Sequence, residues 1–103
     1  MMQGDQYKIP IELKNDDGSA VTQKDLKNLE VFVGNVRKLL SKGEIEFEEI
    51  NGLFYVFVSQ KETFRLRGDV KVQARLLLLS GDVVGVNLGT VNFEESTSKV
   101  VLE

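Results

Sequence analysis

Apolar and polar residues alternate with a period of two along most of the chain, and this pattern predicts strands rather than helices. The clearest runs lie in the second half and cover residues 60–67, 69–79 and 82–93. Gly-Asp pairs separate these runs, as expected for turns between antiparallel strands. Strands that follow one another at regular turns, with no alternating helices, predict an all-β domain.

The first half of the chain adds more strands. Residues 7–14 alternate and contain Pro10, which has no N–H to donate and therefore predicts an edge strand. Residues 15–19 are Asn, Asp, Gly and Ser, which favour a turn. Residues 22–27 are compatible with a capped helical turn, but alternation resumes at Leu29. We therefore interpret them as a short connector that leads into a strand.

A hairpin is predicted in the middle of the chain. Residues 44–48 alternate acidic and apolar side chains, and Asn51-Gly52 is a strong signal for a type I′ turn. The returning strand, residues 53–58, is apolar at every position, so both of its faces need cover and it is either central or interfacial. Residues 36–40 fit a strand or a helical turn equally well.

The last strand contains an irregularity. Its apolar positions change parity near Gly89, and one extra residue there would form a β-bulge. With this strand, the sequence predicts about seven strands in all. The pattern predicts an all-β, immunoglobulin-like antiparallel β-sandwich, although the Cys and Trp that mark antibody domains are absent.

The length of 103 residues predicts a single domain over residues 1–103, with residues 96–103 either a C-terminal arm or the last strand. The first residues are polar and do not resemble a signal peptide, and no stretch reaches the roughly 18 apolar residues that a membrane span needs. We expect no export and no membrane partner. The final pair, Leu102-Glu103, is also common as a cloning remnant and receives no functional weight.

Charge and missing residue types exclude several function classes. The net charge of −3, from 13 basic and 16 acidic residues, leaves no excess of cations for phosphates, so nucleic acid is not an expected partner. Without His or Cys there is no Ser-His or Cys-His nucleophile pair and no zinc or copper site of the usual ligands. We expect a non-enzymatic protein without a cofactor or metal.

Three groups of charged residues have both a functional and a structural interpretation. Four glutamates resemble a divalent-cation site or a catalytic pair, but alternation places most of them on one solvated strand face; they are Glu44, Glu46, Glu48 and Glu49. Asp16-Asp17-Gly18 resembles part of a calcium loop and is better explained as a turn. The third group forms either a basic docking face or a solvated face balanced by Glu62 and Asp69; it comprises Arg65, Arg67, Lys71 and Arg75.

Apolar residues exceed what one core can hold. The strand at residues 53–58 and the end of the strand at 69–79 carry apolar side chains of both parities, so one set needs a second cover. That cover is either a subunit contact or a loop or tail of the same chain. The tail ends in β-prone residues that can pair with a neighbouring sheet edge or form the last strand. The interface candidates are Leu53, Tyr55, Phe57, Leu77, Leu79, Val100 and Val101.

A family resemblance extends over most of the chain. It is carried by residues 59–75, the Gly-Asp hairpin that follows, residues 94–102 and residues 7–12. These segments resemble small (pro)phage proteins of Firmicutes, which are themselves similar to the N-terminal domain of phage baseplate upper proteins. The resemblance implies a tail or baseplate module that attaches to other virion proteins and assembles in several copies, with no catalytic residues.

Together these observations predict a structural and interaction module whose partners are other phage structural proteins or further copies of itself. Its expected location is the cytoplasm of the bacterial host before assembly, and the virion if it is a tail component. The alternative is a carbohydrate-binding or adhesion β-sandwich, which needs exposed aromatic residues; the chain has no Trp and offers only Tyr7 and Tyr55. A third hypothesis is an enzyme that uses the carboxylates of residues 44–49.

Overall fold

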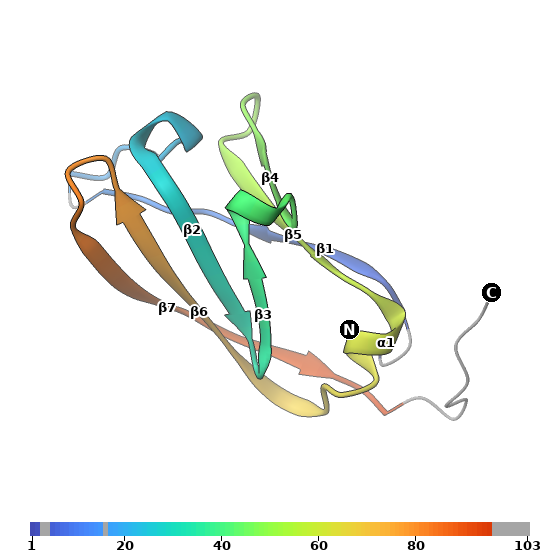
Figure 1. The fold of residues 1–103 in the computed structure, drawn as a ribbon. Coiled ribbons are helices and arrows are strands. Elements are labelled where there is room, and N and C mark those ends of the chain that lie inside the picture. The colour runs from blue at the N-terminus through green and yellow to red at the C-terminus, as the bar shows by residue number, and fades with distance from the viewer. Residues whose placement is uncertain (3–4, 16, 96–103) are drawn as a thin grey trace.

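The computed structural model describes residues 1–2, 5–15 and 17–95, which form two antiparallel β-sheets stacked on one another (Figure 1). One sheet has the strand order β1-β5-β4 and the other β3-β2-β6-β7. The strands are β1 (Tyr7–Ile11), β2 (Leu26–Val33), β3 (Val36–Leu39), β4 (Ile45–Glu48), β5 (Leu53–Val58), β6 (Gly68–Leu78) and β7 (Val83–Phe93). Short helical segments are η1 (Gln23–Asp25), η2 (Leu40–Lys42) and α1 (Gln60–Thr63). The all-β prediction is confirmed.

The strand order differs from that of an immunoglobulin domain. There the second strand lies between the first and the fifth. In this chain β2 lies between β3 and β6, in the other sheet from β1 and β5. The two-layer antiparallel arrangement thus agrees with the prediction, whereas the immunoglobulin strand order is not observed.

The three-stranded sheet has β5 at its centre, as its continuous apolar sequence requires. Pro10 lies on β1 at the sheet edge, as predicted. Glu48 pairs with Leu53, so β4 and β5 are joined by the four residues 49–52 rather than by a two-residue turn. A type I′ turn needs positive φ at both Asn51 and Gly52, and only Gly52 has it, at 65°. The predicted hairpin exists, but its turn type was wrong.

The four-stranded sheet begins with a tight hairpin that the apolar pattern does not reveal. Val33 pairs with Val36, and Gly34-Asn35 makes the turn between β2 and β3. Gly34 has a φ of 61°, as the first central residue of a type II′ turn requires. Of the ambiguous residues 36–40, the first four therefore form strand β3, and Leu40 begins the helical turn η2.

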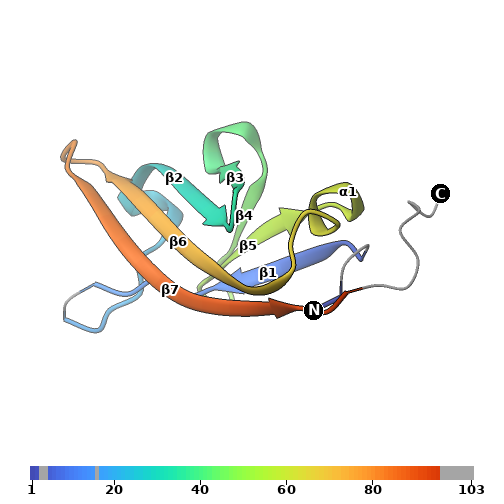
Figure 2. The same cartoon turned by 90° about the horizontal axis from the view of Figure 1, so that it is seen from below.

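Strands β6 and β7 form a long hairpin of two 11-residue strands (Figure 2). Val72 lies opposite Gly89 and Gln73 opposite Asn87, which leaves Leu88 without an opposite residue. Gly89 has a φ of 105°, a conformation that glycine adopts without strain. The predicted β-bulge is therefore confirmed.

Residues 60–67, predicted as a strand, instead form α1 and an irregular segment. A capping box starts the helix: the Ser59 N–H donates to Glu62 Oε1 at 3.0 Å, and the Glu62 N–H donates to Ser59 Oγ at 3.3 Å. Thr63 is fully buried, and its hydroxyl lies 2.8 Å from the carbonyl oxygen of Asp5. These local bonds outweigh the period-two pattern, which here does not reflect a strand.

The core lies between the sheets and takes one parity from each strand, except in β2 and β7, where a register shift changes the parity. Phe54, Val56 and Val58 point inward from β5, and Leu76 does so from β6, as the alternation predicted. The other fully or nearly fully buried side chains include Leu29, Val31, Val33 and Phe93. In the described ranges, the short helical segments are neither long nor apolar enough for one of them to cross a bilayer.

Candidate functional site

The outer face of the three-stranded sheet carries an apolar stripe, defined by Leu53, Tyr55 and Phe57 on the central strand β5. Each of the three is half-buried, whereas the intervening residues of β5 are buried in the core. An antiparallel sheet usually turns polar side chains outward on the face away from its core. An aromatic and aliphatic stripe at the centre of such a face is therefore a feature that the monomer's core does not explain.

Charged side chains border this apolar stripe on both sides. Lys8 lies opposite Phe57 on β1, and its Nζ is 5.2 Å from the centre of the phenyl ring, within the range of a cation–π contact. On the β4 side, Glu46 lies opposite Tyr55 and Glu48 opposite Leu53. A hydrophobic centre with a charged rim matches the composition of protein–protein interfaces.

The tyrosine of the stripe is oriented by a neighbouring carboxylate. A hydrogen bond between the Tyr55 hydroxyl and Glu48 raises the pKa of Tyr55, since the carboxylate favours the protonated phenol. Glu48 also accepts a 2.6 Å hydrogen bond from Asn51 Nδ2 in the β4–β5 loop. The polar end of Tyr55 is thus engaged within the chain, which leaves its ring as the part that a partner would contact.

The remaining candidate interface residues do not join this stripe. Leu77 lies on the outer face of the four-stranded sheet, where it pairs with Val83. Leu79 follows the end of β6 and is 58% exposed, and its N–H donates to the carbonyl of Asp25. Val100 and Val101 lie outside the described residues. The single set of candidates therefore divides into two surfaces on opposite sides of the molecule.

A buried carboxylate lies on the outer face of the four-stranded sheet, beside Leu77. Glu30 is only 7% exposed although it points away from the core, because Arg37 and Arg75 cover it from the neighbouring strands. Arg37 Nε donates to Glu30 Oε2, and Arg75 Nε donates to Glu30 Oε1 at 2.7 Å. The hydrogen bond from Arg37 lowers the pKa of Glu30; burial opposes this shift and Arg75 adds to it.

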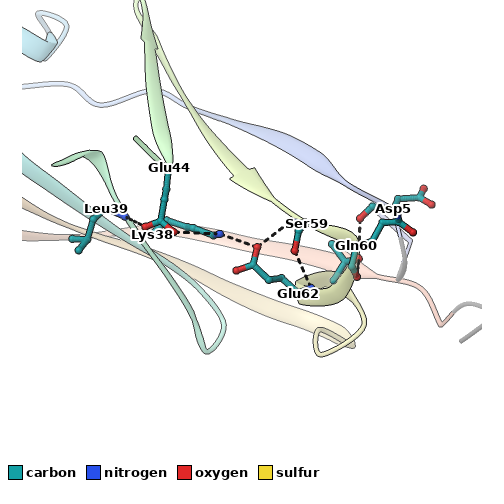
Figure 3. Close-up of polar contacts among 8 residues, drawn as sticks. Asp5, Lys38, Leu39, Glu44, Ser59, Gln60 and Glu62 are labelled. Atoms are coloured by element: carbon teal, nitrogen blue, oxygen red, sulfur yellow. Dashed lines mark hydrogen bonds and ion pairs between the residues drawn. The ribbon is translucent and has the colours of Figure 1, made fainter. Parts of the chain in front are cut away.

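A second ion-pair cluster connects strand β3 of the four-stranded sheet with the residue before β4 and with α1 (Figure 3). Lys38 points inward from β3, and its Nζ lies 2.8 Å from Glu62 Oε1 and 3.7 Å from Glu44 Oε2. The lysine side chain is 9% exposed. Burial alone would raise the pKa of Glu62, but hydrogen bonds from Lys38 and Ser59 outweigh it and lower that pKa.

This cluster connects three parts of the fold rather than presenting a reactive group. Glu44 Oε1 accepts the N–H of Leu39, and Glu62 belongs to the capping box of α1. Lys38 and Glu62 line a recess of about 330 Å³ that also includes Tyr7 and Phe57. Since Lys38 and Glu62 are paired with each other, the geometry favours a structural role for the cluster.

Comparison with known proteins finds no matching family model, curated protein or solved structure. The surfaces of this chain must therefore be interpreted from their own chemistry.

The glutamates of residues 44–49 do not form a common site. Glu44 binds Lys38, and Glu48 binds Asn51 and Tyr55 on the outer face of β4. Within the described ranges, no group of three or more acidic, histidine or cysteine side chains is placed to hold a metal ion. The Asp17 carboxylate accepts the hydroxyl and the N–H of Ser19, which lower the pKa of Asp17, so the described part of the 15–19 segment is a turn.

The predicted basic face is only partly assembled. Arg65, Arg67 and Lys71 line one shallow recess near the β2–β3 turn. Arg75 lies apart from them and is paired with Glu30. Of the two expected balancing carboxylates, Asp69 lines the same recess and also accepts a hydrogen bond from Asn92, whereas Glu62 binds Lys38.

Sequence reasoning missed Glu30 and Lys38, whose ion pairs form only when the strands fold together: Arg37 and Arg75 bind Glu30, and Glu44 and Glu62 bind Lys38. It also missed one local signal, since Ser59 followed by Glu62 is the pattern of a capping box. It gave no weight to the composition of β7, which has neither a charged residue nor a proline along its 11 residues.

Acid is expected to weaken the fold through Glu30 and Glu62. Both have folded-state pKa values below the ordinary 4.5, so the unfolded chain takes up protons first as the pH falls. Their contribution to the stability of the fold is therefore complete above about pH 4.5 and is lost progressively as the pH falls below that value. Urea unfolding between pH 7 and pH 3 should show this loss, and the free energy of unfolding should fall less for Glu30→Gln than for wild type. An equal loss in both proteins would remove Glu30 as a cause.

Proposed function

We propose that this chain is a non-enzymatic structural and interaction module that acts by docking onto other proteins. The observation that carries the proposal is the apolar stripe of Leu53, Tyr55 and Phe57 at the centre of an outward-facing sheet. Covering such a stripe removes apolar area from water, and the charged rim then selects the orientation of the partner.

The resemblance to small Firmicutes (pro)phage proteins extends this proposal to a tail or baseplate component. In that setting the partners are other phage structural proteins or further copies of the chain, encountered first in the bacterial cytoplasm and retained in the virion. The two-sheet architecture and the stripe are compatible with this role. An adhesion or carbohydrate-binding domain is the competing function, because Tyr55 and Phe57 are partly exposed aromatic side chains.

The test is affinity capture from a lysate of the bacterium that encodes this chain, with identification of the captured proteins by mass spectrometry. We expect phage tail or baseplate proteins with wild type and their loss with the double variant Tyr55→Ser/Phe57→Ser. Leu79→Ser is the matched control, since it removes an exposed apolar side chain outside the stripe.

Two results would contradict the proposal. Equal capture by wild type and the double variant would show that the stripe is not the docking surface. Binding of wild type to a glycan array that depends on Tyr55 and Phe57, without capture of any tail protein, would favour the adhesion function instead.

A further inference from the structure

The exposed edge of β7 differs from the other three sheet edges. Strand edges present unpaired N–H and C=O groups, and proteins usually protect them with charges, proline, bulges or short length. Here β1 contains Pro10, β4 carries Glu46 and Glu48, and β3 has only four residues, two of them Arg37 and Lys38. Strand β7 has 11 residues, no charge and no proline.

The outward-facing N–H and C=O groups of β7 fall into two halves, one on each side of the bulge. Leu78 donates its N–H to the Asp82 carbonyl at the turn. From there, opposite residues of β6 and β7 alternate between pairs that exchange backbone hydrogen bonds and pairs that do not. Val84 and Val86 therefore bond to β6, while Val83, Gly85 and Asn87 direct their N–H and C=O away from it. Beyond the bulge, the even-numbered residues are the ones that direct their N–H and C=O away from β6.

Within the described residues, the N-terminus occupies the second half. The amino group of Met1 donates to the Asn92 carbonyl at 2.8 Å, and the Glu94 N–H donates to the Met1 carbonyl at 2.7 Å. These bonds and the bulge protect the end of β7, so the accessible edge is residues 83–87. Figure 2 shows this part of β7 along the margin of its sheet, next to the protruding β6–β7 turn.

The same region holds exposed apolar side chains. Val83 is 62% exposed and Val84 44%, and Leu79 in the adjoining turn is 58% exposed. Val84 is on the inward-facing side of the sheet, opposite Leu76, yet the second sheet does not cover it. An uncharged edge beside uncovered valines is suited to receive another β-strand.

We propose that residues 83–87 of β7 pair antiparallel with the same residues of a second copy of this chain, around a two-fold axis at Gly85. Gly85 then faces Gly85 of the second copy, Val84 faces its Val86, and Val83 faces its Asn87. The valines cover each other on the inner face, and the four-stranded sheets join into one eight-stranded sheet.

A second copy is the partner that the charges favour. Self-pairing places each residue near its own counterpart, so β3 would bring together its basic residues and β4 its glutamates. Strand β7 brings no like charges together. The contact is small compared with the roughly 1,200 Å² of stable interfaces, so we expect a weak dimer that strengthens with concentration.

The inference rests on the proposed assembly function and names one partner for it. It is tested by sedimentation of the full chain over a concentration series. Wild type should dimerise as the concentration rises, and Gly85→Lys should weaken dimerisation by about fivefold or more, because two ammonium groups then face each other. A Cβ at Gly85 meets no atom within 4 Å, so the monomer has space for the new side chain, which lies on the outer face opposite Arg75.

Charge complementation makes the test specific. Gly85→Glu alone should also be monomeric, and an equimolar mixture with Gly85→Lys should restore dimers. Thr90→Glu is the control for Gly85→Glu, because it adds the same charge to exposed β7 beyond the bulge, opposite Lys71, and should behave as wild type. In wild type, the Val83, Gly85 and Asn87 amides should become protected from hydrogen exchange as the concentration rises.

The inference is overturned if wild type remains monomeric at about 1 mM, where even a dimer with a Kd of about 1 mM would contain half of the chains, or if the Lys and Glu variants do not complement each other. Either outcome leaves the proposed docking through Tyr55 and Phe57 intact, because those residues lie on the other sheet. Loss of capture by the Tyr55→Ser/Phe57→Ser variant is in turn independent of β7.

Discussion

Phe54→Ala is expected to destabilise the fold by about 3–5 kcal/mol, whereas Phe57→Ala should cost no more than about 1 kcal/mol. The two phenylalanines lie on the same strand, three residues apart, and therefore point to opposite faces of the sheet. Phe54 is fully buried and its ring lies 4.7 Å from that of Phe47, so truncation opens a cavity in the core. Phe57 faces outward beside Lys8, where water fills the space.

Urea unfolding of both variants, followed by circular dichroism, measures this difference directly. Similar losses of stability in the two proteins would contradict the assignment of the stripe to the outer face. A large loss of stability for Phe57→Ala alone would indicate that Phe57, and not Phe54, faces the core.

Lys38→Met is expected to cost roughly 2–3 kcal/mol, less than the full penalty for breaking a buried ion pair, since both carboxylates retain some contact with water. The substitution keeps the apolar stem of the side chain but removes the cation from Glu62 and Glu44, which are 24% and 34% exposed. The link between β3, the start of β4 and the cap of α1 is then lost.

The matched control is Lys42→Met, an exposed lysine at the end of η2, which should change stability by less than about 0.5 kcal/mol. In the double variant Lys38→Met/Glu62→Gln, part of the lost stability should return, because one unpaired carboxylate is gone. Additive losses from the two substitutions would show that Lys38 and Glu62 do not interact.

The parts of the fold that depend on alternation could be predicted from the sequence. The edge position of Pro10 follows from local composition alone, and the continuous apolar run of β5 limits that strand to a central or an interfacial position. The bulge at Gly89 was also predictable, because the apolar positions change parity there. Each of these features depends on the residues of one strand alone.

Features that depend on distant partners could not be predicted in this way. Lys38 takes an inward position that alternation reserves for an apolar residue, and its ion pairs with Glu44 and with Glu62, 24 residues later, make this favourable. Likewise, nothing local shows that Leu53 and Leu77 belong to different sheets and so to different surfaces. The division of the interface candidates follows from strand order, which alternation does not specify.

The extra residue in β7 also constrains how the hairpin can form. Val84 and Val91 are seven positions apart, so a regular strand would turn them to opposite faces, yet both face the core side of the sheet. Pairing that grows from the turn at residues 80–82 must therefore skip Leu88 before the far half of the hairpin can join. If it does not, Phe93, which is 1% exposed in the folded chain, faces water and the core stays open at that end.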